Sequence, residues 1–447
     1  MNLKEIKTKN VSAISLGCDK NRIDLEKMLF NLKNFGFNVI PNVEEAHIVI
    51  INTCAFITPA VNEAIENILS VLTLKNKGLE KVIVTGCLVS RFKNEIIAHL
   101  DGVDAFVDLK DNQNIVNIVL GLYDVKDNNY QFTNGRLLTN QPHFAYLKIA
   151  DGCDNGCAYC TIPRIRGRFK SVPEEDIIKE AKMLAEMGVK ELIIVAQDTT
   201  RYGIDLYGEY RLVPLIKKLS KIKGIRWIRL HYLYPEMVTN ELLDEINNNP
   251  KVCKYVDIPF QHIDEKILKS MNRRSTEQQI RDLVKNIQTN YPQIAIRSTF
   301  IVGFPGEGRK EFKKLLGFLK EARLNNVGFF PFSKEEKTKA YFLKKQVPNF
   351  IKKHRVKKVQ KVQEQIMNAN NINQIGNIVQ IIVDFFDEDE GYYVCRTMQN
   401  SPDVDFYVLI DANSNVQVGE IYTAKLTDYL YYFFKGELVW IYQINYR

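Results

Sequence analysis

Three cysteines stand close together in one short segment of the chain. Cys153, Cys157 and Cys160 are spaced four and then three residues apart in a glycine-containing run that follows an apolar stretch. A structural zinc site or a ferredoxin cluster is held by four thiolates, whereas an iron–sulfur cubane held by three leaves one iron open to another molecule. The segment therefore predicts a cluster that takes part in a reaction.

Three further cysteines each follow an apolar run in the first hundred residues. The runs cover residues 11–17, 47–53 and 81–86, and the cysteines are Cys18, Cys54 and Cys87. If the runs are parallel strands of a doubly wound sheet, their carboxyl ends share one edge, where loops can bring the thiols together. A single buried cysteine is usually a packed apolar residue, but three at equivalent positions favour a second metal-binding triplet.

Length and composition indicate a soluble protein of more than one domain. The 447 residues exceed one ordinary core, so two or three domains are expected. No apolar run approaches the roughly 20 residues that cross a bilayer. The first residues lack the features of a secretory signal, so we expect a reducing cytoplasm without disulfides. Cys253 and Cys395 have no partners and are expected to be structural.

The net charge of +8 is unevenly distributed along the chain. Residues 373–447 contain four Lys or Arg against eleven Asp or Glu, a net charge of −7, so residues 1–372 carry +15. Basic regions often bind nucleic acid, whereas an acidic region is better suited to a basic partner. We therefore expect the two parts to bind partners of opposite charge. The acidic run at residues 387–390 could equally be a solvated turn.

The order of apolar runs indicates three structural units. Residues from about 11 to 124 alternate β-rich and helical segments, for example 11–17 and 21–35, as βαβ units do. A polar connection at residues 124–131 indicates a boundary. Six candidate strands then alternate with helices, at residues 144–150, 191–197, 226–232, 255–261, 294–302 and 327–332. Six βα units suggest an incomplete parallel barrel with its chemistry at the carboxyl ends of the strands, where the Cys153 segment falls.

The last part of the chain changes texture after a basic helical stretch at residues 352–367. Five short β-rich runs follow, at residues 377–386, 391–396, 406–410, 420–426 and 437–444. They suggest a small closed antiparallel barrel. The predicted fold class is therefore multidomain α/β, with a doubly wound α/β domain at 8–126, a partial (βα)6 TIM-like barrel at 139–370 and a small β-barrel at 373–447.

Several motifs resemble one enzyme family. The Cys-x3-Cys-x2-Cys segment with Tyr159 before its last cysteine resembles the signature of radical S-adenosylmethionine (SAM) enzymes, and the second triplet resembles their methylthiotransferase branch. Similar stretches lie at residues 15–21, 52–57, 196–203, 231–235, 257–262 and 300–307. Residues 196–203 and 384–390 resemble the members that modify a ribosomal protein rather than transfer RNA. Asp19, Val172 and Gly308 depart from the common pattern without removing a candidate ligand.

This resemblance implies an amino-terminal methylthiotransferase domain, a radical SAM barrel and a TRAM-type barrel. It implies that each cysteine triplet holds one 4Fe-4S cluster, with SAM as radical source and as methyl donor. The radical takes hydrogen from an unactivated carbon, which acid–base catalysis cannot do because that C–H bond has no accessible pKa. The implied product is 3-methylthioaspartate in small-subunit ribosomal protein S12, free or on the ribosome. A reducing electron donor and a sulfur donor are further implied partners.

Other polar residues at predicted strand ends are weaker candidates. Gln197, Gln261 and Arg297 could reach the ribose or carboxylate of the cofactor, or could equally serve hydrogen bonds within the fold. The turn that begins at Gly303 could let backbone approach the cofactor. We expect two histidines, His231 and His262, to be satisfied barrel residues rather than metal ligands. Three arginines could contact substrate or be plain surface residues, namely Arg164, Arg166 and Arg168.

Two other functions stay open at this point. A methylthiotransferase that acts on a transfer-RNA adenosine is favoured by the +15 of residues 1–372 and disfavoured by the acidic tail. A noncatalytic iron–sulfur electron carrier or ribosome-binding scaffold is disfavoured, since it has no use for an open iron beside a six-unit barrel.

Overall fold

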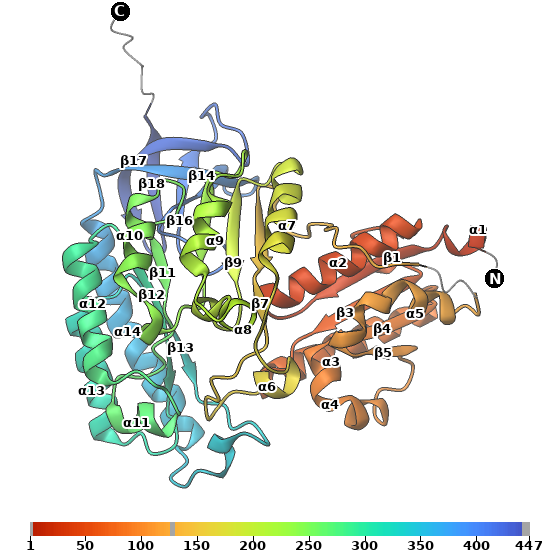
Figure 1. Cartoon of the computed structure of the whole chain (residues 1–447), viewed down its shortest axis with the longest axis horizontal. Helices are drawn as coiled ribbons and strands as arrows, with labels where there is room; N and C mark the ends of the chain where they lie inside the picture. The colour runs from red at the N-terminus through yellow and green to blue at the C-terminus, as the bar shows by residue number, and fades with distance from the viewer. Residues whose placement is uncertain (1–2, 126–129, 440–447) are drawn as a thin grey trace, which may run out of the picture.

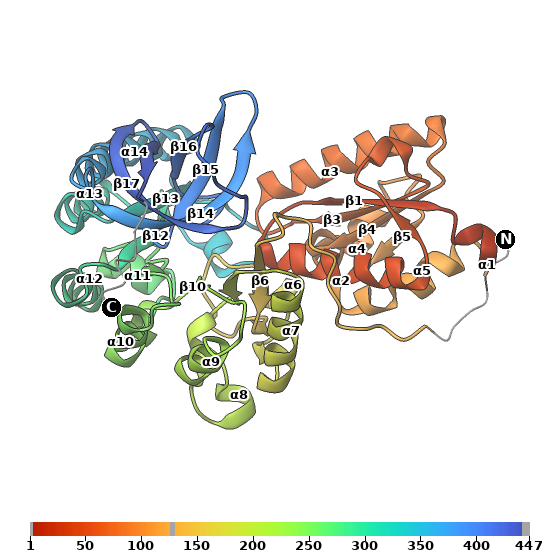
Figure 2. The same ribbon diagram turned by 90° about the horizontal axis from the view of Figure 1, so that it is seen from above.

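The protein is described here by a computed structural model, which covers residues 3–125 and 130–439. Three units follow one another along the chain (Figure 1). An N-terminal α/β unit lies at one side of a half-barrel, and a small β-barrel lies across one end of that half-barrel (Figures 1 and 2). Among the described residues, no helix is both long and apolar enough to span a membrane.

The N-terminal unit is a parallel sheet covered on both faces. Its strand order is β2-β1-β3-β4-β5, with bounds β1 (Asn10–Ser15), β2 (Asn38–Val39), β3 (Ile48–Thr53), β4 (Lys81–Gly86) and β5 (Ala105–Val107). The helices are α1 (Leu3–Ile6), α2 (Asp19–Phe35), α3 (Thr58–Leu72), α4 (Cys87–Ile97), α5 (Ile115–Gly121), η1 (Val43–Glu45), η2 (Thr73–Lys77) and η3 (Leu109–Asn114). Apolar residues of α2 and α5 pack on one face, and those of α3 and α4 on the other. The predicted doubly wound domain is therefore confirmed.

The half-barrel contains all six predicted parallel strands. They are β6 (Phe144–Lys148), β9 (Glu191–Val195), β10 (Trp227–Leu230), β11 (Tyr255–Asp257), β12 (Ala295–Val302) and β13 (Asn326–Pro331). They form two three-stranded sheets, β10-β9-β6 and β11-β12-β13, joined by a bridge between Ile228 and Val252. Since β6 and β13 do not pair within the described residues, the barrel is open, as predicted.

Longer helices cover the outside of the half-barrel, and shorter ones lie in its loops. They are α6 (Ile162–Ile165), α7 (Glu174–Glu186), α8 (Ile204–Tyr207), α9 (Leu212–Leu219), α10 (Asn240–Asn248), α11 (Glu265–Ser270), α12 (Glu277–Asn290), α13 (Arg309–Ala322), α14 (Asn349–Ile372), η4 (Thr199–Arg201), η5 (Pro235–Met237) and η6 (Lys339–Phe342). Alternate residues of β12, such as Ile296 and Phe300, are buried in the core beneath these helices. Because side chains alternate along a strand, Arg297 and Thr299 face the barrel interior.

The C-terminal unit is a closed barrel in the order β14-β15-β16-β18-β17. Its strands are β14 (Ile378–Asp387), β15 (Tyr392–Thr397), β16 (Tyr407–Asp411), β17 (Ile421–Leu430) and β18 (Phe433–Leu438). The closing pair, β16 and β18, is parallel, whereas the other pairs are antiparallel as predicted. The expected last strand at 437–444 was wrong in its start, because the chain turns at Tyr431 and pairs again from Phe433. Residues 440–444 of that expected strand lie outside the described residues.

The predicted domain boundaries stay a prediction. Residue 126 and residues 440–447 of those bounds lie outside the described part of the chain.

Buried ion pairs fix the C-terminal barrel to the half-barrel. Arg396 lies 2.6 Å from Asp384 and 2.8 Å from Glu191, and Arg229 lies 2.7 Å from Glu191. Burial alone would raise the pKa of Glu191, but the two arginines outweigh it and lower that pKa. Asp384 belongs to the acidic tail, yet its carboxylate accepts hydrogen bonds from Arg396 at this junction.

Candidate active site

The first triplet follows β6 and lies in the loop between two short paired strands, β7 (Ala150–Asp151) and β8 (Lys170–Ser171). The Cys153 amide donates to the carbonyl of Gly167 (3.1 Å), so the loop folds back on itself. Gly152 has a φ of +72°, and a Cβ there would lie 2.1 Å from the Arg168 carbonyl oxygen. Only glycine allows this close return of the backbone.

Polar groups surround the thiols of this loop. Arg273 lies over the ring of Tyr234 and donates towards Cys157 Sγ at 3.8 Å, and the Tyr234 hydroxyl is 3.7 Å from the same sulfur. Burial raises the pKa of the Cys153 thiol, and it raises the pKa of Cys160 to about 12. Such thiols become thiolates when a bound metal compensates the charge.

The second triplet is assembled by the register of three adjacent strands. Ser15 of β1 pairs with Asn52 of β3, and Thr53 pairs with Gly86 of β4. The cysteines follow directly, at the carboxyl ends of these strands, as Cys18, Cys54 and Cys87. A Cβ on Gly17, which has a φ of +101°, would lie 2.7 Å from Cys54 Cβ, so glycine permits this approach. The parallel-strand expectation is therefore met.

Asn21 lies at the centre of the second triplet. Its side-chain amide donates to the Thr53 carbonyl (2.9 Å), and its Oδ1 accepts from the Cys87 thiol (3.4 Å). Burial raises the pKa of Cys54, and it raises the pKa of Cys87 to about 12. The positive charge of Arg166, which comes from the other loop, acts in the opposite direction on both pKa values.

Arg166 joins the two triplets. Its guanidinium donates to Asp24 (2.9 Å), to Asp151 (2.9 Å) and to Asn21 Oδ1, and its side chain is 3% exposed. Burial works to lower its pKa, but Asp24 and Asp151 raise it well above its usual value. Arg166 is thus a buried link between units, while Arg164 and Arg168 are exposed. The sequence showed no sign of this role, because Arg166 was expected to contact substrate or to be a plain surface residue.

A second link, which the sequence did not reveal, comes from the loop after β13. Glu335 accepts from the Thr58 amide (2.7 Å) and from Arg91 (2.8 Å), and it is 2% exposed. Arg91 also donates to the Ala55 carbonyl (2.8 Å). Since Thr58 and Arg91 each lie four residues beyond a cysteine, this carboxylate holds the second triplet against the half-barrel.

Gln197 has a buried side-chain oxygen, Oε1, without a partner among the described residues. It follows β9, and its amide donates to Asp151 Oδ1 (3.0 Å) beside the first triplet. A buried acceptor without a partner is costly. The contact of Gln197 with cofactor remains a prediction.

Gln261 and Gly303 lie on neighbouring strands. Gln261 has a φ of +69°, and its backbone bonds to Thr299 and Ile301 of β12. Gly303 has a φ of +77°, and a Cβ there would lie 2.4 Å from Lys352 Cγ. The Gly303 amide donates to Glu307 (2.9 Å), which fixes the turn. The contacts of Gln261 and Gly303 with cofactor remain a prediction.

Arg297 lies between the second triplet and the C-terminal barrel. It is 3.2 Å from Asp257 and 3.5 Å from Asp405. It lines a cavity of about 570 Å³ that also contains Cys18 and Tyr232. The contact of Arg297 with cofactor remains a prediction.

The two histidines and two cysteines that were expected to be structural lie in structural surroundings. His231 Nε2 is 2.8 Å from Ser401 Oγ, and burial lowers its pKa well below the usual value. His262 accepts from the Asp264 amide through Nδ1 (3.0 Å). Cys253 and Cys395 are fully buried in apolar clusters.

The thiols do not form a site for a single metal ion within the described residues. All eight thiols are free. Within residues 3–125 and 130–439, no three Cys, His, Asp or Glu side chains converge closely enough to hold one metal ion. A cubane takes each thiolate on a different iron, so its ligands need not converge on one point.

Three family models match the chain. Residues 10–108 match the uncharacterized protein family UPF0004, residues 147–319 match the radical SAM superfamily, and residues 375–439 match the TRAM domain. The superfamily implies a 4Fe-4S cluster and SAM.

Curated relatives match nearly the full length. The protein named ribosomal protein uS12 methylthiotransferase RimO from Thermoanaerobacter sp. (strain X514) is 41% identical, over 96% of this chain and all of that one. The protein of the same name from Elusimicrobium minutum (strain Pei191) is 42% identical, over 96% and 99%.

A solved structure shares the fold at low identity. The radical SAM methyltransferase TsrM from Kitasatospora setae has a TM-score of 0.55 and 13% identity, covering 72% of this chain and 73% of its own. This likeness shows the fold alone, whereas the full-length curated relatives show the family. The chain belongs to the RimO family of methylthiotransferases within the radical SAM superfamily.

Proposed function

We propose that this protein converts one aspartate of ribosomal protein uS12 to 3-methylthioaspartate. A methylthio group replaces one hydrogen on the β-carbon of that aspartate. The observation that carries the proposal is the meeting of two cysteine triplets at one junction, where Arg166 contacts Asn21 on one side and Asp151 on the other. The names of the full-length relatives support the same substrate.

In this proposal Cys153, Cys157 and Cys160 hold the 4Fe-4S cluster, which together with SAM supplies the radical that removes hydrogen from carbon. Arg273 and Tyr234 cover the Cys157 sulfur and limit the access of water to it. Gln197 presents its unpartnered Oε1 to a donor group of the cofactor. The tight return at Gly152 holds the loop in shape.

Cys18, Cys54 and Cys87 would hold a second 4Fe-4S cluster, which would supply the sulfur, and a second SAM would supply the methyl group. Arg166 and Asn21 keep this triplet against the first loop. A substrate carbon placed in the cavity that contains Cys18 would lie beside the second triplet. A reducing electron donor and a sulfur donor complete the proposed partners, in the cytoplasm.

The charge of the C-terminal barrel supports a basic protein substrate over transfer RNA. Residues 373–447 carry −7. Asp384 and Asp405 are engaged in ion pairs with arginines, so the acidic surface comes mainly from exposed residues such as those at 388–390. A phosphate backbone requires a basic surface, whereas this one complements a basic ribosomal protein.

Anaerobic reconstitution with iron and sulfide, followed by SAM and reductant, tests the proposal. Purified uS12 and bulk transfer RNA serve as competing substrates, and mass spectrometry of both follows. A gain of one methylthio group on an aspartate of uS12 is expected, together with 5′-deoxyadenosine. The same gain on a transfer-RNA adenosine would identify the rival substrate, and no 5′-deoxyadenosine would identify a noncatalytic carrier.

A further inference from the structure

The loop after β13 and the first half of α14 concentrate the positive charge of the molecule. Residues 333–361 contain eleven Lys or Arg and two Glu, a net charge of +9 that exceeds the +8 of the whole chain. Nine of these cations are exposed lysines, which we call the basic strip: Lys334, Lys337, Lys339, Lys344, Lys345, Lys353, Lys357, Lys358 and Lys361.

The other two cations fix the strip to the fold. Lys352 Nζ donates to the Phe332 carbonyl (2.8 Å), and Arg355 donates to Glu307 (2.6 Å). The buried face of α14, which includes Val359, packs in the half-barrel core. The helix lies beside β13 and α13 (Figure 1). The exposed lysines therefore stand on a rigid support.

Most of the strip lacks a counter-charge. Lys337 pairs with Glu95 at 3.5 Å, with both side chains largely exposed, and Lys334 lies 4.4 Å from the ring centre of Tyr341. The other seven lysines form no ion pair or side-chain hydrogen bond with any part of the chain that the structure describes. Like charges at this density repel one another, and a polyanion would relieve that repulsion.

Exposed aromatic rings flank the strip. Phe342 and Phe350 are 75% and 73% exposed, although both are large apolar side chains. At the other end of α14, Tyr431 is 81% exposed, in the turn between β17 and β18. Lysines with interspersed aromatic faces are the combination that binds nucleic acid, through phosphate contacts and base stacking.

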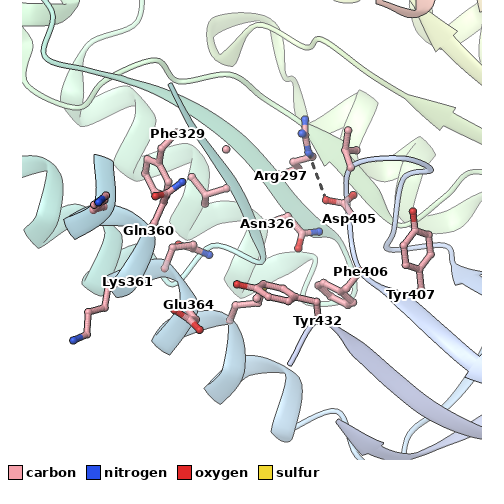
Figure 3. Close-up of a pocket in the computed structure, with 16 residues that line it drawn as sticks. Arg297, Asn326, Phe329, Gln360, Lys361, Glu364, Asp405, Phe406, Tyr407 and Tyr432 are labelled. Atoms are coloured by element: carbon pink, nitrogen blue, oxygen red, sulfur yellow. Dashed lines mark ion pairs between the residues drawn. The ribbon is translucent and has the colours of Figure 1, made fainter. Parts of the chain in front are cut away.

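A groove borders the strip. It encloses about 750 Å³ between α14 and the C-terminal barrel. Lys361 lies at its outer rim, and the pair of Arg297 and Asp405 lies at another part of its wall (Figure 3). Arg297 also lines the cavity that contains Cys18, so the groove and that cavity share part of one wall.

We propose that the basic strip binds RNA, so that the enzyme engages its protein substrate within an RNA-containing particle. This inference rests on the proposed function, which makes the substrate a ribosomal protein. An anionic membrane is a poorer partner, because the apolar face of α14 is already buried and cannot insert into lipid. The basic strip and the acidic barrel then meet the RNA and the protein of one particle.

The test removes charge only from lysines outside the groove. The strip variant carries K344Q, K345Q, K353Q and K358Q. The matched control carries K179Q, K182Q, K221Q and K223Q, four exposed lysines around α7 and α9 that form no ion pair within the described residues. Binding of a labelled oligouridine is measured by fluorescence anisotropy between about 50 and 200 mM salt. Methylthiolation is measured on free uS12 and on intact small ribosomal subunits.

Wild type and control should bind the RNA alike. The strip variant should lose about tenfold or more in affinity, with a salt slope about 3 units shallower, since each phosphate contact contributes about 0.7. Its rate should fall on the intact subunit and stay unchanged on free uS12, which also shows that it is folded.

Two results would overturn the inference: unchanged RNA affinity in the strip variant, or equally tight binding of wild type to phosphatidylserine vesicles. Failure of the proposed function is distinguishable from both. It would leave both forms of uS12 unmodified, while the RNA measurements still decide the role of the strip.

Discussion

The two cysteine triplets lie at carboxyl ends of parallel strands, but they are built in different ways. One occupies a single loop between residues 153 and 160, whereas the other draws on three strands between residues 18 and 87. The first is a short segment whose backbone returns tightly at Gly152. The second exists only when β1, β3 and β4 are adjacent and in register. The comparison shows that three thiols can be gathered within one loop or by strands far apart in the chain.

The largest expected effect separates the tasks of the two triplets. Cys157→Ala should reduce both 5′-deoxyadenosine and methylthio product to the level without enzyme. Cys54→Ala should abolish the product yet retain formation of 5′-deoxyadenosine, because it leaves the loop triplet intact. Both are quantified by liquid chromatography and mass spectrometry, with Cys253→Ala as a control that retains both activities. Equal loss of 5′-deoxyadenosine in the two variants would mean that the triplets act as one unit.

Cutting the link between the triplets should have the next largest effect. Arg166→Met leaves Asp24 and Asp151 without this buried cation, which should cost about 4 kcal/mol. Faster hydrogen exchange in α2 would report the loosened junction. Arg168→Met removes an exposed arginine and should change stability by less than about 0.5 kcal/mol. Similar exchange rates in both variants would show that Arg166 does not join the units.

The dependence of the second triplet on sheet backbone can be tested at Gly86. A Cβ there would lie 2.4 Å from the Thr53 carbonyl oxygen, at a φ of +96°, so Gly86→Ala should cost about 3 kcal/mol. Gly78→Ala is the matched control, since its φ is +109° and nothing lies within 4 Å of its Cβ; it should cost about 1 kcal/mol. Urea unfolding of the metal-free protein measures both, and equal costs would contradict the steric argument.

The smallest effect concerns the Glu335 clamp and depends on pH. Burial would raise the pKa of Glu335, but Ser333, the Thr58 amide and Arg91 lower it below 4.5. The carboxylate therefore stabilises the fold above pH 4.5, and this contribution disappears as the pH falls through the lowered pKa. Glu335→Gln should cost about 2 kcal/mol at neutral pH and progressively less below pH 4.5.

Unfolding of the metal-free protein from neutral to acid pH measures this difference. Glu336→Gln, at the exposed neighbour, should show no such pH dependence. A Glu335→Gln difference that is constant with pH would show that ionisation of the clamp is not what matters.

Much of the fold follows from local patterns. The expected runs at 47–53 and 81–86 correspond to β3 and β4 within one residue, because buried parallel strands are continuous apolar runs. The last strand was misplaced, because Tyr431 and Tyr432 form a turn although aromatic residues usually favour strands. The ion pairs of Arg166 and Glu335 were not predicted, since a charged residue in a sequence looks the same on a surface and in an interface.

The sequence by itself determined where strands end and that a reactive loop follows the first strand of the half-barrel, because periodicity and thiol spacing are properties of neighbouring residues. Only the tertiary structure decided that β1, β3 and β4 are neighbours, that β16 closes the barrel beside β18, and that Arg166 joins both triplets. Such arrangements depend on packing and charge pairing between segments far apart in the chain, which no local pattern encodes.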